Sequence, residues 1–193
     1  MTKWLSHRMV ERGIIKEEEQ ELYQFGIRNG MILLLNVVTA LVIGLLTEQL
    51  AVVAVFTLSF MVLRSYTGGY HSDSRIFCYL GSNLVLLVPV YTQAVFYKTS
   101  LAWLLAVLLV SAGIIFLLSP MHSKNRKLDK EEQKHFGRKA RLIAALELAV
   151  LGLFWHAGQV PYAYAVYTGI CITALFMLVG KAQLWIQSHT ENG

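Results

Sequence analysis

A histidine and a cysteine, seven residues apart, are the residues of this chain whose types could do chemistry together. They lie in the stretch RSYTGGYHSDSRIFCYLGSN, residues 64–83, as His71 and Cys78. On one unbroken helix they would stand about 10.5 Å apart along the axis, whereas a proton-transfer pair needs about 3 Å or one bridging water. Gly68 and Gly69 permit a helix break, and residues 72–74 (Ser-Asp-Ser) are candidate caps for a following helix. We therefore expect the chain to fold back between the two residues.

Such a fold would favour nucleophilic chemistry at the sulfur. A cysteine at the start of a helix, beside a histidine and an arginine, has surroundings that favour the thiolate. The histidine could serve first as base to the thiol and then as acid to a leaving amine. Arg64 and Arg75 could bind a substrate carboxylate or anchor the loop to phosphates. The alternative interpretation is a simple turn at Gly68 and Gly69, followed by Cys78 as a small hydrophobic residue of an apolar helix.

The composition indicates which elements must position this pair. Of the 193 residues, 55% are hydrophobic and only 15% are charged, whereas a soluble domain carries roughly 25% charged residues. These values predict a polytopic all-α membrane protein and give no reason to expect a nucleic-acid partner. Two cysteines, Cys78 and Cys171, exclude a disulfide scaffold and form no zinc-finger pattern. We expect no metal and no organic cofactor.

Six apolar segments approach the roughly 20 residues that span a bilayer core. We expect one membrane domain over residues 1–193, with an interfacial helical segment at 1–28 and a basic loop at 119–139. The six predicted transmembrane helices cover residues 30–46, 50–66, 76–97, 101–118, 140–156 and 162–180.

The distribution of lysine and arginine predicts how these helices are oriented. With six spans, all of the 17 lysines and arginines except Lys98 fall in the termini and loops of one side. Because short cytoplasmic loops are enriched in these residues, both termini, the loop at 64–75 and the basic loop should face the cytoplasm. In the basic loop, Lys124, Arg126 and Lys127 could anchor the chain to anionic lipid or bind an acidic peptide. Glu147 should not face lipid, so it should pair with an arginine or line a peptide cavity.

The order of residues in the motif supplies a resemblance. Arg64, Gly69, His71 and Cys78, at the end of the second of six predicted helices, resemble the motif of the accessory gene regulator protein B (AgrB) family. The charged N-terminal segment and the lysine-rich loop after the fourth helix are also similar. Members of that family are membrane-embedded cysteine endopeptidases, so the resemblance implies that His71 and Cys78 are catalytic and that Arg64 and Gly69 support the motif.

The resemblance also implies a substrate and a setting. The substrate would be an AgrD-like quorum-sensing propeptide with an acidic C-terminal tail, which is cleaved through a thioester on Cys78 and cyclised to a thiolactone or lactone. The enzyme would be a homodimer in the plasma membrane of a Gram-positive bacterium, with its active site on the cytoplasmic side. Two other classes stay open: a small peptide transporter or exporter, and a non-catalytic membrane assembly factor.

Overall fold

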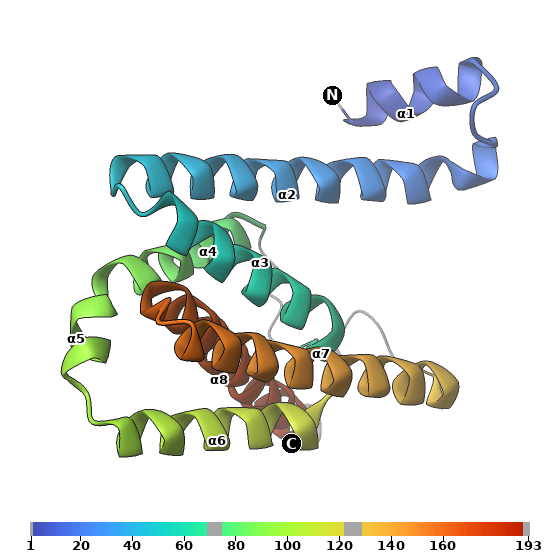
Figure 1. The fold of residues 1–193 in the computed structure, drawn as a ribbon. Coiled ribbons are helices and arrows are strands. Elements are labelled where there is room, and N and C mark those ends of the chain that lie inside the picture. Colours follow the sequence, from blue (N-terminus) through green and yellow to red (C-terminus); the bar gives the residue numbers. More distant parts are fainter. Residues whose placement is uncertain (1, 69–74, 122–128, 191–193) are drawn as a thin grey trace. The chain divides into compact units, whose positions relative to one another are not determined.

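The computed structural model describes residues 2–68, 75–121 and 129–190, without the side chains of residues 2, 75–78, 130 and 187–190. Every regular element in these ranges is a helix, which confirms the predicted all-α class. The chain divides into two compact units, residues 1–39 and 40–193. The two helix-rich units are drawn in Figure 1.

The first unit holds α1 (Thr2–Glu11), the short 3-10 helix η1 (Glu17–Glu19) and the larger part of α2 (Gln20–Leu46). Helix α2 begins ten residues before the predicted start at residue 30, because the segment KEEEQELYQF is itself a good helix former. Gly13 adopts a φ of 66° between α1 and η1. The predicted interfacial segment at 1–28 is thus largely helical.

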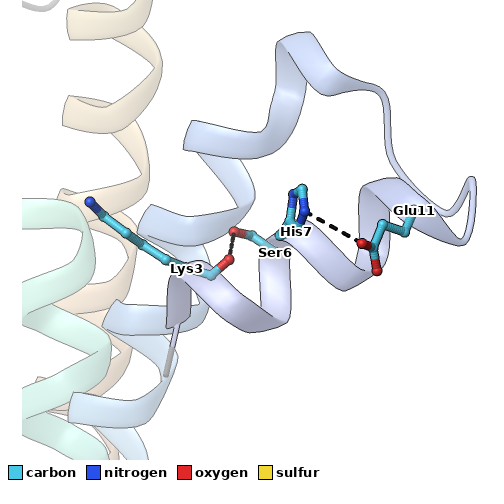
Figure 2. A network of polar contacts seen from close by, with 4 residues as sticks. All are labelled: Lys3, Ser6, His7 and Glu11. Carbon is cyan, nitrogen blue, oxygen red and sulfur yellow. Dashed lines mark hydrogen bonds and ion pairs between the residues drawn. The ribbon is translucent and has the colours of Figure 1, made fainter.

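Helix α1 is stabilised by local polar contacts. The hydroxyl of Ser6 donates to the carbonyl of Lys3 at 3.0 Å, and Nε2 of His7 lies 3.4 Å from a carboxylate oxygen of Glu11 (Figure 2). Ser6 is fully buried, whereas His7 and Glu11 are exposed. The side of α1 that carries Ser6 is therefore packed, whereas the side that carries His7 is exposed.

The second unit is an assembly of helices joined by short connections. It contains the last turns of α2, followed by α3 (Leu50–Thr67), α4 (Arg75–Tyr91), α5 (Gln93–Lys98), α6 (Leu101–Leu118), α7 (Lys130–His156) and α8 (Val160–Thr190). Helix α7 begins ten residues before the predicted residue 140. Asp129 explains this early start, because its side chain accepts from the backbone N–H of Glu131 and forms a capping box with Glu132.

Helix α8 is the core element of the second unit. It contacts α3, α6 and α7, and Figure 1 shows it crossing the middle of this part of the molecule. In the apolar stretch of α8, 67% of the residues are buried, against 33% in α3 and 17% in α6. Small residues on α8, among them Ala163, Ala165 and Gly169, are buried and let the neighbouring helices approach closely.

A hydrogen bond joins α3 to α7, and α8 packs closely against it. Ser59 on α3 donates its hydroxyl hydrogen to the carboxylate of Glu147 on α7 at 2.5 Å. On α8, a Cβ added to Gly169 would lie 2.6 Å from the Ser59 hydroxyl oxygen. Glu147 therefore has a structural partner inside the bundle, and that partner is a serine where the sequence suggested an arginine or a peptide cavity.

The predicted helix at 76–97 is interrupted in the structure. Pro89 lacks an N–H group and lies two residues before the end of α4 at Tyr91, and the chain turns at Thr92 before α5 begins. The Thr92 hydroxyl contacts the Tyr164 hydroxyl at 2.5 Å and donates to the Val88 carbonyl at 2.8 Å. These contacts hold the turn against α8.

Four helices within the described ranges are long and apolar enough to cross a membrane by length and composition. They are Glu17–Leu46, Leu50–Thr67, Leu101–Leu118 and Val160–Ile186. Helix α4 has a shorter apolar part, Tyr79–Tyr91. The membrane character predicted from composition agrees with these helices, while the six-span count and the orientation of the termini stay predictions.

Candidate functional site at the root of the motif loop

The structure places part of the predicted site. Arg64 lies in the last turn of α3 with a described side chain. Arg75 is the first residue of α4 and Cys78 the fourth, and both are placed by their backbone. Gly69 and His71 lie outside the described residues, as do Lys124, Arg126 and Lys127 of the basic loop. The approach of His71 to Cys78 stays a prediction.

Cys78 is the fourth residue of α4, whose described part begins at Arg75, directly after residues that lie outside the described ranges. The N-terminal turn of a helix carries a partial positive charge, and a thiolate on such a turn is stabilised by that charge. The predicted helix start at residue 76, which would put Cys78 on the first turn, stays a prediction.

Arg64 stabilises the C-terminal end of its own helix, α3. Its guanidinium donates a hydrogen bond to the carbonyl of Gly68 and lies 5.4 Å from the ring centroid of Phe176 on α8. The last carbonyls of a helix lack partners within the helix, and a basic side chain can satisfy them. The described contacts of Arg64 therefore hold Gly68, the last described residue before residues 69–74 of the motif loop.

Gly68 is the point at which the chain leaves α3. Its φ of 72° and ψ of −154° suit glycine and strain other residues. A Cβ at this position would lie 2.6 Å from the carbonyl oxygen of Met121. The N–H of Met121 in turn donates to the carbonyl of Thr67 at 2.9 Å. The segment that follows α6 is thus bonded to the residue that ends α3.

Helix α7 completes this arrangement. Gly137 packs against Pro120, because a Cβ at residue 137 would lie 3.1 Å from the Cδ of the proline. The Tyr66 ring on α3 lies 6.4 Å from the ring of Phe136, and Nζ of Lys139 lies 5.9 Å from the Tyr66 centroid. We call Thr67, Gly68, Pro120, Met121 and Gly137 the loop junction.

The loop junction brings together the end of α3 and the segment after α6. From the sequence, the motif loop and the basic loop that follow them were treated separately. Gly68 is the last described residue before residues 69–74 of the motif, and Met121 is the last described residue before residues 122–128 of the basic loop at 119–139. The first glycine of the Gly-Gly pair was visible as a helix break, but its contact with Met121 was not. No local pattern marks Met121 or Gly137 as partners of α3, since 54 to 70 residues of chain separate them from Thr67.

The remaining described residues suggest no metal site. No cluster of three or more histidine, cysteine, aspartate or glutamate side chains suited to a metal occurs in residues 2–68, 75–121 and 129–190. Cys171, the other cysteine, lies half-buried on α8.

Comparisons with known proteins agree with the family that the motif suggested. The model of the family described as Accessory gene regulator B matches residues 1–179. A putative AgrB-like protein of Clostridium perfringens (strain SM101 / Type A) is 23% identical over 148 residues, which cover 74% of this chain and 69% of the relative. The Accessory gene regulator protein B of Staphylococcus intermedius is 25% identical over 156 residues, 79% of this chain and 80% of the relative.

A second Clostridium perfringens relative, from strain 13 / Type A and named putative AgrB-like protein 2, is 24% identical over 131 residues. That match covers 65% of this chain and 61% of the relative. No solved structure matches the chain. The family match includes all of the described helices up to the last turns of α8, together with the whole motif from Arg64 to Cys78. The chain therefore belongs to the accessory gene regulator B family.

Proposed function

We propose that this protein is a membrane-embedded cysteine endopeptidase that removes the C-terminal tail of a quorum-sensing propeptide. The observation that carries the proposal is the family match over residues 1–179, which includes the ordered motif Arg64, Gly69, His71 and Cys78. Two structural features support it. Cys78 is the fourth residue of the described part of α4, and Arg64 donates a hydrogen bond to Gly68, the last described residue before His71.

In the proposed first step, the imidazole of His71 takes the proton of the Cys78 thiol, and the thiolate attacks a peptide carbonyl of the propeptide. The C–N bond of the tetrahedral intermediate then breaks. The new amine of the tail leaves with the proton returned by His71, and the rest of the peptide stays on Cys78 as a thioester. Backbone N–H groups at the start of α4 are the donors available for the oxyanion.

In the second step, a thiol or hydroxyl within the bound peptide attacks the thioester carbonyl. A new thioester or ester bond closes the ring, and the Cys78 thiolate is released and reprotonated. The exchange of one thioester for another is close to neutral in free energy, so removal of the tail or the ring would drive the sequence. Binding the attacking group beside the acyl-enzyme raises its effective concentration relative to water.

The setting of this reaction is part of the proposal. Six spans with both termini in the cytoplasm would place the root of the motif loop at the cytoplasmic face of a Gram-positive plasma membrane. The basic residues Lys124, Arg126 and Lys127 would receive the acidic tail of the substrate. A homodimer is the proposed assembly.

The test is co-expression of the full chain with a candidate propeptide, followed by mass spectrometry of the released tail. Cys78→Ala and His71→Ala should each abolish cleavage. Cys171→Ala and His156→Ala are the matched controls, since these residues lie on α8 and at the end of α7, and both should cleave like the wild type. A peptide linked to Cys78 through a thioester should accumulate when the attacking thiol of the substrate is replaced.

Two results would contradict the proposal. If the Cys78→Ala variant still cleaves the propeptide, Cys78 takes no part in the reaction. If an intact peptide is exported, and export persists in both Cys78→Ala and His71→Ala, the transporter class would be favoured instead. All variants should be compared at equal amounts of protein in the membrane, so that lost activity is not confused with lost expression.

A further inference from the structure

The exposed side of α7 changes its character along the helix. Toward its N-terminus it presents Lys134, Arg138 and Arg141, which are exposed and lie at helical spacings of four and three residues. Residues this far apart share one face of a helix. Lys134 and Arg138 make no ion pair with a carboxylate in the described part of the chain. Their charges therefore lack a protein partner in those ranges.

The same side becomes apolar immediately after Arg141. Leu142 is 61% exposed, Leu146 56% and Leu153 69%, and all three belong to the continuous helix α7. In a membrane these three leucines would lie against acyl chains. A single straight element thus carries a basic region and an apolar region in direct succession, which matches the succession of headgroups and hydrocarbon in a bilayer.

The position of this change agrees with the ends of two other apolar helices. Nε of Arg141 donates to the carbonyl of Phe116 at 3.1 Å, in the last turn of α6. The loop junction holds the end of α3 at Thr67 against Met121, directly after α6. The end of α6 therefore lies at the level of Arg141, and the end of α3 lies about one turn earlier on α7, beside Phe136 and Gly137.

From Arg141, a rise of about 1.5 Å per residue places Arg138 about 4.5 Å and Lys134 about 10.5 Å farther along α7. The headgroup layer on each side of a bilayer is roughly 5–8 Å thick. For a helix along the membrane normal, Arg138 would fall within that layer and Lys134 just beyond it. The long side chain of Lys134 could still reach back toward the lipid phosphates.

We propose that the face formed by Lys134, Arg138 and Arg141 on α7 binds the headgroups of anionic phospholipids. Charge complementarity and the continuity of this face with exposed leucines favour lipid over a peptide partner, which would need no adjoining apolar surface. Arg138 makes the largest contribution because it lies within the phosphate layer. The proposal does not depend on cysteine chemistry, since none of these residues belongs to the motif.

The test uses the full chain in detergent micelles, with phosphatidylglycerol as the anionic probe and phosphatidylcholine as the zwitterionic one. Binding is measured by native mass spectrometry across a lipid titration. Each basic residue near a membrane surface contributes about a fivefold gain in affinity for anionic lipid. The double variant Lys134→Gln/Arg138→Gln should therefore bind phosphatidylglycerol about 25-fold more weakly. Lys98→Gln, an exposed lysine in α5, is the matched control and should bind like the wild type.

Three further comparisons decide the result. Arg138→Gln alone should weaken binding more than Lys134→Gln alone, and raised salt should weaken wild-type binding of phosphatidylglycerol but not of phosphatidylcholine. Equal affinity of the double variant and the wild type would overturn the proposal. It would also be overturned if the double variant lost binding of a hexaglutamate peptide while keeping that of phosphatidylglycerol, because the face would then serve an acidic peptide. The wild-type salt series tests the proposal even if a variant is unstable.

Discussion

The contact between Gly169 on α8 and Ser59 on α3 allows a test of the bundle core by exchanging the sizes of two residues. Gly169→Ala adds a methyl group whose carbon would lie 2.6 Å from the Ser59 hydroxyl oxygen and 3.2 Å from its Cβ. Ser59→Gly removes both of these atoms. The nearest remaining neighbour is then the backbone nitrogen of Phe60, at an ordinary 3.5 Å. The effect of Gly169→Ala should thus depend on the residue at position 59.

In the wild-type background Gly169→Ala should destabilise the protein. Overpacking a core by one methyl group costs about 1–3 kcal/mol. A rotation of Ser59 away from the clash would break its bond to Glu147, and an unpaired buried polar group costs about 1–3 kcal/mol. Either route costs about 2 kcal/mol, and the alanine regains about 1 kcal/mol of helix propensity, so the free energy of unfolding should fall by about 1 kcal/mol. For a chain of this length the corresponding fall in Tm is about 2–4 °C.

In the Ser59→Gly background the sign should reverse. Ser59→Gly alone is destabilising, because it removes the bond to Glu147 and introduces a glycine into a helix. Adding Gly169→Ala to it should then raise stability by about 1 kcal/mol, the advantage of alanine over glycine within a helix. The two substitutions are therefore coupled by about 2 kcal/mol, which is the clash that Ser59→Gly relieves, because the gain in helix propensity is present in both backgrounds and cancels.

The assay is thermal unfolding of the purified protein in one detergent, followed by size-exclusion fluorescence, for the wild type, both single variants and the double variant. Gly113→Ala in α6 is the control, because nothing lies within 4 Å of a Cβ at that position; its Tm should not fall. An equal change of Tm on Gly169→Ala in both backgrounds would refute the reasoning, since it would mean that the two side chains do not meet.

Three other substitutions test separate contacts by the same measurement. Gly68→Ala should lower the free energy of unfolding by about 1–3 kcal/mol because of its φ of 72° and the nearby Met121 carbonyl; an unchanged Tm would contradict that geometry. Thr92→Val should cost about 1 kcal/mol by removing the hydroxyl that contacts Tyr164, and adding Tyr164→Phe to it should cause little further loss. Arg141→Gln removes the donor to the last turn of α6 and, because this arginine is exposed, should cost less than about 1 kcal/mol.

Much of the local structure could be predicted from the sequence. The bounds of α3 and α6 follow from apolar runs that end at Gly68 and at Pro120, and the motif from Arg64 to Cys78 pointed to the family that the comparisons confirm. The early start of α7 at Lys130 was missed although its signal was present. Asp129 followed by Glu132 is a capping box, and charged residues after it were assigned to a loop because they were polar.

The partners of each helix were decided by the tertiary structure. Composition and charge determined that the chain is a set of apolar helices with basic connections, and spacing identified His71 and Cys78 as the candidate pair. Neither could indicate that α8 forms the core, that Glu147 bonds Ser59, or that Met121 meets Thr67. The physical reason is that lipid and protein interior are both apolar, so hydrophobicity does not distinguish the buried face of a membrane helix from its exposed face. That choice depends on how small residues such as Gly169 fit against a neighbour, which only the packed structure specifies.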